Sequence, residues 1–180
     1  ASAVRVSGDN VWIVFHDGER IASGDNWQAP TVTEFDLDKN GGALIAIYVL
    51  DVAPGADGVG AMLADIILDD GTYIPTSEDE PGWVCDRGGF DRNGDWVTVA
   101  FDDSAWIPLS FFDKFPGGVW GGGAALMTAA FGAPEVDAYW SCCLGNGKTD
   151  DAYFRYRIET LAVEPNGKSA TRWATLKAAL

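Results

Sequence analysis

Short β-rich runs separated by polar turn signals constrain the fold of this chain more than any other feature. Three of the runs are "NVWIVF" (Asn10–Phe15), "ALIAIYVLDV" (Ala43–Val52) and "DAYFRYRIETLAV" (Asp151–Val163). The second is apolar almost throughout, which is typical of a strand covered on both faces. Turn signals such as Asp17-Gly18 and Asp70-Gly71 lie between apolar runs, and turns spaced by about 8–12 residues indicate a sandwich or a barrel. The sequence therefore predicts an all-β fold.

Helical signals are few and short. "AALMTAAF" (Ala124–Phe131) predicts a short helical segment, and Ser169 is a candidate N-cap for a helix over Ala170–Leu180. "WVTVAFDD" (Trp96–Asp103) is expected to form a further strand. A chain of 180 residues suits one domain. We expect a single β-sandwich domain over residues 1–180, with its core at about residues 11–160 and a basic C-terminal tail at 164–180.

The charge of the chain excludes two classes of partner. Twenty-seven Asp and Glu residues oppose 12 Lys and Arg residues, giving a net charge of −15. Such a chain repels phosphate backbones, so we expect no nucleic-acid partner, and it repels anionic membranes for the same reason. The apolar run at Ala43–Val49 is far shorter than the roughly 20 residues that a membrane span needs. We therefore expect no membrane insertion.

Three cysteines bear on the compartment in which the protein works. Cys85 can bridge to Cys142 or to Cys143, which would close a loop long enough to stabilise the fold by roughly 4 kcal/mol. A strained bridge between Cys142 and Cys143, or three reduced buried thiols, are the alternatives. A bridge from Cys85 implies an oxidising, extracellular compartment. Ala1 in place of Met fits a mature chain after signal removal, and fits a trimmed chain as well.

The order of several motifs resembles a known family. Quoted along the chain, the motifs are "WIVFHDGERIASGDNW" (12–27), "FDLDKNGGALIAIYVLD" (35–51), "DDGTYIPTSEDEPGWVC" (69–85), "FDDSAW" (101–106) and "YFRYRI" (153–158). Together they resemble the galactose-binding-like jelly-roll family, in particular the sandwich modules attached to rhamnosidases and to other extracellular proteins. The chain departs from the pattern in having His16-Asp17-Gly18 where that family usually has Asn-Gly. The resemblance implies a jelly-roll β-sandwich, and because the family includes sugar binders, calcium-stabilised modules and structural domains, it leaves the ligand open.

Aromatic and polar side chains on predicted loops are the candidates for ligand binding. Sugar recognition needs an aromatic face that stacks on C–H groups and polar side chains that bond hydroxyls. The alternative for each tryptophan is a plug in the core. The candidates form three groups along the chain, which are Asp25, Asn26 and Trp27; Trp83, Asp86 and Arg87; and Trp120 within its glycines.

A second candidate site is a structural calcium site. Asp36, Asp38 and Asn40 alternate on a turn, and oxygens spaced in this way can converge on Ca²⁺. The twelfth position of this stretch is Ile47, where an EF-hand needs Glu, so an EF-hand is excluded. The alternative is an ordinary turn in which the side chains bond their own backbone.

The sequence favours binding over catalysis. His16 is the one histidine, and there is no G-x-S-x-G or H-E-x-x-H motif. Acidic pairs for glycoside hydrolysis are possible, but nothing singles out two of the 27 acids. We therefore expect a secreted, non-enzymatic, lectin-like module that binds a glycan or glycoconjugate. The alternatives are a self-associating structural subunit of an extracellular filament, array or matrix, and an enzyme acting on a glycan.

Overall fold

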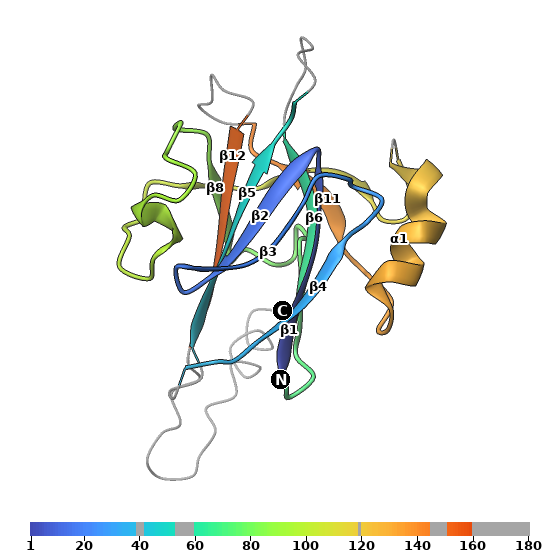
Figure 1. Cartoon of the computed structure of the whole chain (residues 1–180), viewed down its shortest axis with the longest axis horizontal. Helices are drawn as coiled ribbons and strands as arrows, with labels where there is room; N and C mark the ends of the chain where they lie inside the picture. The colour runs from blue at the N-terminus through green and yellow to red at the C-terminus, as the bar shows by residue number, and fades with distance from the viewer. Residues whose placement is uncertain (39–41, 53–59, 119, 145–150, 160–180) are drawn as a thin grey trace, which may run out of the picture.

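Two antiparallel sheets face each other in the structure, which is a computed structural model that describes residues 1–38, 42–52, 60–118, 120–144 and 151–159. Figure 1 shows the sheets as two layers, with the helix α1 (Ala124–Phe131) beside one of them. The predicted all-β sandwich is confirmed, as is the helical segment at α1. The expected C-terminal helix and basic tail lie outside the described residues.

The first layer, called sheet A, has the strand order β10-β11-β6-β1-β4, and β7 pairs with β6 beside this path. Its strands are β1 (Ser2–Asp9), β4 (Thr31–Phe35), β6 (Ala61–Ile67), β7 (Tyr73–Pro75), β10 (Ser110–Lys114) and β11 (Tyr139–Cys142).

The second layer, called sheet B, has the order β3-β2-β5-β12-β8-β9. Its strands are β2 (Val11–His16), β3 (Glu19–Gly24), β5 (Ala43–Leu50), β8 (Trp83–Asp86), β9 (Ile107–Pro108) and β12 (Asp151–Ile158). The strand β5 lies between β2 and β12 and is buried on both faces, which explains its near-continuous apolar sequence.

The predicted hairpin turn at Asp17-Gly18 is confirmed. His16 pairs with Glu19, so two residues close the hairpin between β2 and β3. Both Asp17 and Gly18 have positive φ, at 48° and 94°, as a type I′ turn requires. The Asp17 carboxylate also accepts a hydrogen bond from the backbone N–H of Leu44 at 2.7 Å, which ties the turn to the start of β5.

Two expectations about local structure are corrected. The core begins earlier than residue 11, because β1 pairs with both β4 and β6 and buries Val4 and Val6. Residues 96–103 do not form a strand; they contain a short 3₁₀ helix, Asp95–Val97, followed by turns. Trp96 packs against side chains on the outer face of sheet B. Packing against the sheet, and not pairing with a neighbouring strand, therefore decides the conformation of this segment.

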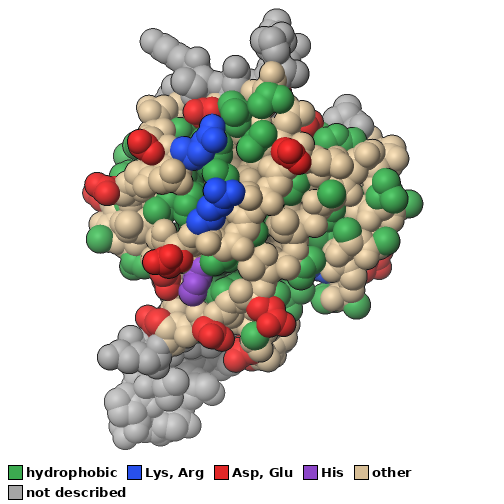
Figure 2. All heavy atoms as spheres, viewed as in Figure 1, with side chains coloured by type: hydrophobic (Ala, Val, Ile, Leu, Met, Phe, Trp, Pro, Cys, Tyr) green, Lys and Arg blue, Asp and Glu red, His purple; other side chains and the backbone are tan. Residues whose placement is uncertain are grey.

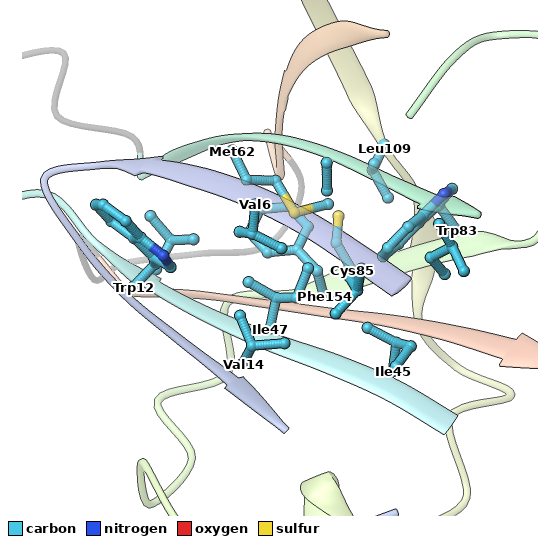
Figure 3. Packing of buried hydrophobic residues seen from close by; sticks show 14 of the residues in the cluster. Val6, Trp12, Val14, Ile45, Ile47, Met62, Trp83, Cys85, Leu109 and Phe154 are labelled. Atoms are coloured by element: carbon cyan, nitrogen blue, oxygen red, sulfur yellow. The ribbon is translucent and has the colours of Figure 1, made fainter. Parts of the chain in front are cut away.

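The space between the sheets holds the main hydrophobic core. Trp12 and Trp83 lie at opposite ends of the group drawn in Figure 3, with side chains such as Val6, Ile47 and Met62 between them. All five are at most 2% exposed.

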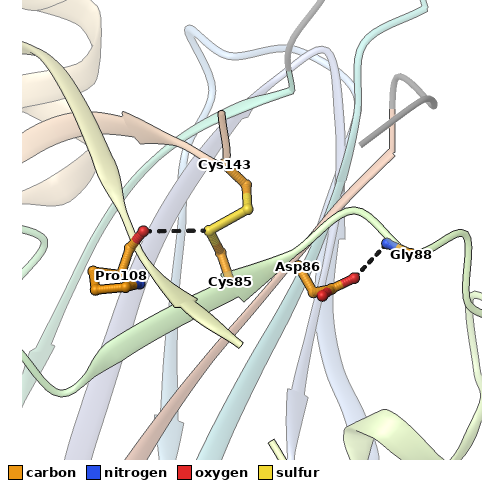
Figure 4. Close-up of a disulfide and its surroundings, with 5 residues drawn as sticks. All are labelled: Cys85, Asp86, Gly88, Pro108 and Cys143. Atoms are coloured by element: carbon orange, nitrogen blue, oxygen red, sulfur yellow. Dashed lines mark hydrogen bonds between the residues drawn. A yellow bond between two sulfur atoms is a disulfide. The ribbon is translucent and has the colours of Figure 1, made fainter. Parts of the chain in front are cut away.

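A disulfide joins the two layers at one point of this core. Cys85, on β8 of sheet B, is bonded to Cys143, which directly follows β11 of sheet A, and Figure 4 shows the bridge. The two Cα atoms are 5.8 Å apart. The predicted bridge from Cys85 is therefore present with Cys143 as its partner, and Cys142 is a buried free thiol. A disulfide is compatible with an extracellular environment.

Both outer faces of the sandwich are also covered. Between β8 and β9 the chain packs Trp96, Val97 and Trp106 onto side chains from β2, β5 and β12. On the opposite side, α1 packs Met127 and Phe131 onto sheet A. Figure 1 shows these two covers flanking the sandwich, the yellow-green segment on one side and α1 on the other. No helix among the described residues is long and apolar enough to cross a bilayer.

Each cover is held by a buried arginine. On sheet A, Arg5 donates to both carboxylate oxygens of Asp65 at 2.7 and 2.6 Å and to the carbonyl of Pro134, beyond α1, at 2.6 Å. On sheet B, Arg155 donates to Asp103 at 2.6 Å and to the carbonyls of Trp96 and Thr98. The guanidinium groups thus bond strands to the segments that cover them.

We expect loss of the disulfide to lower the free energy of unfolding by about 4 kcal/mol, because the bridge spans a sequence separation of 58 residues and restricts the unfolded chain. The measurement is urea unfolding of the protein with and without reductant. The Cys142→Ala variant is the control and should keep the full response to reductant. An unfolding curve of the unaltered protein that does not move with reductant would contradict this expectation.

We expect Asp65→Asn to lower the free energy of unfolding by about 3–5 kcal/mol, because it leaves the buried charge of Arg5 without its carboxylate. The matched control is Asp137→Asn, which removes an exposed ion pair with Lys114 and should cost less than about 1 kcal/mol. Equal effects of the two substitutions in thermal or urea unfolding would show that the burial of the Arg5 pair contributes nothing.

Candidate functional site

The loop between β3 and β4 crosses from sheet B to sheet A and carries the first group of predicted ligand-binding residues. Asp25 and Asn26 are exposed on this loop, and Trp27 is half-buried. The side-chain oxygen of Asn26 accepts a hydrogen bond from the backbone N–H of Gln28 at 3.1 Å, so the loop is closed by a local turn. Both polar side chains remain accessible from solvent.

Trp27 and Trp120, which lie 93 positions apart in the sequence, converge on one buried side chain, Trp140 of β11. Trp120 stacks on Trp140 with ring centroids 4.4 Å apart and an interplanar angle of 17°. Trp27 meets Trp140 edge to face at 6.4 Å. Phe112 of β10 adds a fourth ring, 5.7 Å from Trp120. We call Trp27, Phe112, Trp120 and Trp140 the aromatic cluster.

Polar contacts hold the two half-buried indoles in place. The indole N–H of Trp120 donates to Asp9 at 3.0 Å, and the hydroxyl of Ser7 donates to the backbone carbonyl of Trp27 at 2.6 Å. Gly123 leaves room for the Trp27 ring, since a Cβ at that position would lie 2.4 Å from it. The Trp120 indole is therefore held by a side-chain bond, and the backbone of Trp27 is bonded while Gly123 gives its ring space.

The outer part of the aromatic cluster is open to solvent. Phe112 is 43% exposed, and Trp27 and Trp120 are each half-buried, whereas Trp140 beneath them is fully buried. Rigid aromatic faces on a buried support are the arrangement that stacks on the C–H faces of a sugar ring. The cluster could also seat the apolar side chains of a protein partner.

A cavity of about 370 Å³ lies at the start of the same loop. Asp25, Ser23 and Arg20 line it from β3 and the loop, and Arg92 lines it from the segment that covers sheet B. Ligand sites for small molecules fall in the range of about 300–1,000 Å³, so this cavity is large enough for a sugar-sized ligand. Asp25 belongs to the cavity, and Trp27, two residues on, belongs to the aromatic cluster.

A hydrogen-bonded network positions Arg92 at the cavity. Its guanidinium lies over the ring of Tyr48 at 4.8 Å and donates to the Tyr48 hydroxyl at 3.2 Å. The Tyr48 hydroxyl donates in turn to Asp151 at 3.0 Å. The neighbouring Tyr153 hydroxyl donates to the carbonyl of Phe90 at 2.6 Å. Burial, opposed by the bond from Arg92, raises the pKa of Tyr48, and burial together with the charge of Asp151 raises the pKa of Tyr153.

The second predicted group does not join this site. Trp83 is 2% exposed and packs against Tyr156 at a tilted angle, so it offers no face to a ligand; its expected position on a loop is corrected. Asp86 ends β8 and accepts a hydrogen bond from the backbone N–H of Gly88, as Figure 4 shows. Arg87 follows it, half-buried. These residues adjoin the disulfide.

The structure describes two of the three predicted calcium ligands. Asp36 and Asp38 are exposed, and Asn40 lies outside the described residues. Asp38 accepts a hydrogen bond from the backbone N–H of Gly42 at 2.9 Å, as in the turn that was the alternative interpretation. Among the described residues, no group of three or more His, Cys, Asp or Glu side chains is placed to hold a metal ion. Calcium binding at this turn stays a prediction.

Sequence reasoning missed several residues of the site, among them Phe112, Arg20 and Arg92. Phe112 was not singled out because "SFFDK" has the composition of an ordinary strand, and neighbouring Phe111 does pack against the core. Arg20 and Arg92 were not linked because nothing local relates a hairpin strand to a loop 70 residues later. The excess of acidic residues could have directed attention to the few arginines.

Known proteins offer no further guide to this site. Comparisons of the chain with protein-family models, with curated proteins and with solved structures found no match. The two-sheet sandwich is compatible with a jelly roll, and the galactose-binding-like relationship remains a resemblance of sequence motifs.

We expect ionisation of buried tyrosines to lower the free energy of unfolding as the pH rises above about 10. The reason is that Tyr48 and Tyr153 have folded-state pKa values above the ordinary value of about 10, so their ionisation favours the unfolded chain. The measurement is urea unfolding across this pH range together with the ultraviolet absorbance of tyrosinate. Complete tyrosine ionisation near pH 10 with the fold intact would contradict the burial of these hydroxyls.

Proposed function

We propose that the protein is a secreted, non-enzymatic carbohydrate-binding module. Its binding surface is formed by the aromatic cluster and by the cavity at the start of the β3–β4 loop. Trp120, Phe112 and Trp27 stack on the C–H faces of sugar rings, and Asp25 and Asn26 bond hydroxyls from the β3–β4 loop.

The observation that carries this proposal is the convergence of Trp27 and Trp120 on Trp140. Aromatic residues from separate loops meet at one place, remain partly exposed and are held by Ser7 and Asp9. Partly exposed aromatic side chains that gather at one place are a common feature of ligand-binding and partner-binding surfaces. Polar side chains directly beside the cluster favour a ligand that has both apolar faces and hydroxyl groups, as sugars do.

The alternative of a self-associating assembly subunit has less support. An odd number of cysteines could leave one thiol to link chains covalently. Cys142 is fully buried, however, and burial raises the pKa of its thiol to about 11, so the reactive thiolate is scarce. A basic tail that docks on an acidic body would also support assembly, but it concerns residues outside those described. Among the described residues, the assembly hypothesis rests on the aromatic cluster, where it predicts association and not glycan binding.

We expect Trp120→Ala to weaken glycan binding at least about tenfold, because loss of a stacked ring costs about 1.5 kcal/mol or more. The measurement is a glycan array followed by titration calorimetry with the best ligand, with and without EDTA to test for calcium. Phe112→Ala, in which a 43% exposed ring is removed, should weaken binding without affecting the fold.

The matched control is Leu126→Ala, which removes an apolar side chain that is 62% exposed on α1 and outside the cluster. It should bind glycans as the unaltered protein does. Near-ultraviolet circular dichroism shows whether each variant is folded. A protein that binds no glycan and associates through the cluster, with Phe112→Ala restoring the monomer, would contradict the carbohydrate-binding role and support the assembly role.

A further inference from the structure

The cavity at the start of the β3–β4 loop brings together two arginines from distant segments. Arg20 comes from β3, and Arg92 comes from the segment that covers the outer face of sheet B. Both side chains are exposed, and both line the same cavity of about 370 Å³ with Ser23 and Asp25. Figure 2 shows Lys and Arg side chains gathered near the middle of one face, in the region of β2 and β3, with acidic side chains around them.

These two arginines lack the carboxylate partners that other basic side chains have. Arg5 is paired with Asp65, Arg155 and Arg157 share Asp103, and Lys114 is paired with Asp137. Arg20, in contrast, donates to the hydroxyl of Ser23 at 2.6 Å, and Arg92 donates to the hydroxyl of Tyr48 at 3.2 Å. Within the described part of the chain, neither guanidinium forms an ion pair.

Guanidinium groups without a direct carboxylate partner are a specific feature in a chain with a net charge of −15. A guanidinium has five N–H donors in a planar fork that matches a carboxylate or a sulfate group. One donor of each arginine is engaged with a hydroxyl, which orients the side chain and leaves the other donors for a ligand. Two such forks at one cavity make a receptor for an anionic group.

We propose that the glycan bound by this protein is acidic, carrying uronate or sulfate groups, and that Arg20 and Arg92 hold its anionic group in the cavity. This inference rests on the proposed carbohydrate-binding function and names the class of sugar. Asp25, which also lines the cavity, repels a free anion but accepts hydrogen bonds from hydroxyls next to the anionic group. Two guanidinium groups beside one carboxylate acceptor therefore favour an acidic sugar, which has both an anionic group and hydroxyls, over a simple inorganic anion.

The test compares acidic polysaccharides with their neutral counterparts. The probes are polygalacturonate against its methyl ester, and dextran sulfate against dextran; inorganic sulfate is titrated separately. We expect the unaltered protein to bind at least one acidic polymer about tenfold more tightly than its neutral partner, and whichever pair responds identifies uronate or sulfate. Each of Arg20→Gln and Arg92→Gln should reduce that affinity about tenfold, as expected for loss of a charge-assisted hydrogen bond.

Lys114→Gln is the control for general charge effects. Lys114 is 51% exposed and lies on β10 of sheet A, outside the cavity lining. The control should bind the acidic polymer as the unaltered protein does, and all three variants should keep the thermal midpoint of the parent. A loss with Lys114→Gln as large as with the arginine variants would overturn the inference, as would equal affinity for acidic and neutral polymers.

The outcomes also separate this inference from the proposed function. Binding of neutral glycans that depends on Trp120 but not on Arg20 or Arg92 would retain the carbohydrate-binding role and overturn the acidic-ligand inference. Arginine-dependent binding of inorganic sulfate without binding of any polymer would overturn both, and so would the absence of binding to every probe.

Discussion

The guanidinium of Arg155 is buried against the outer face of sheet B, and the segment between β8 and β9 is folded around it. A buried charge is tolerated only when it is paired and hydrogen-bonded. Arg155 meets this requirement by bonding Asp103 and the carbonyls of Trp96 and Thr98, which all belong to that segment. The same segment carries Arg92 to the edge of the cavity. The position of Arg92 at the cavity thus depends on the ion pair between Arg155 and Asp103. This pair lies on the outer face of sheet B, which points away from the core between the sheets.

Sheet A repeats this arrangement with Arg5. Its bonds to Asp65 and to the carbonyl of Pro134 connect β1, β6 and the chain that follows α1. A buried ion pair adds little net stability compared with well-packed apolar side chains. It does fix the orientation of the two segments that it joins. With both outer faces covered, the aromatic cluster formed by Trp27 and Trp120 lies where loops from the two sheets meet. The position of the proposed ligand-binding surface therefore depends on the two segments that cover the outer faces of the sheets.

Much of the fold could be predicted because its signals are local. The turn at Asp17-Gly18 needs positive φ at two positions, and Asp-Gly is among the few dipeptides that supply it. The apolar run in β5 identified a strand covered on both faces, and Ala124–Phe131 formed the expected helix. The strand β1 was missed because Arg5 interrupts its apolar pattern, and this charge is buried only because Asp65 lies on the paired strand.

The sequence by itself determined that the chain forms strands and where most of them turn, since these properties follow from neighbouring residues. Only the tertiary structure decided that Cys143 is the partner of Cys85, that Trp83 is a core residue and that Trp27 and Trp120 share a support. It also decided that Arg20 and Arg92 line one cavity. The physical reason is that a tryptophan or an arginine has the same local preferences in a core and on a surface, and its surroundings come from segments many residues away.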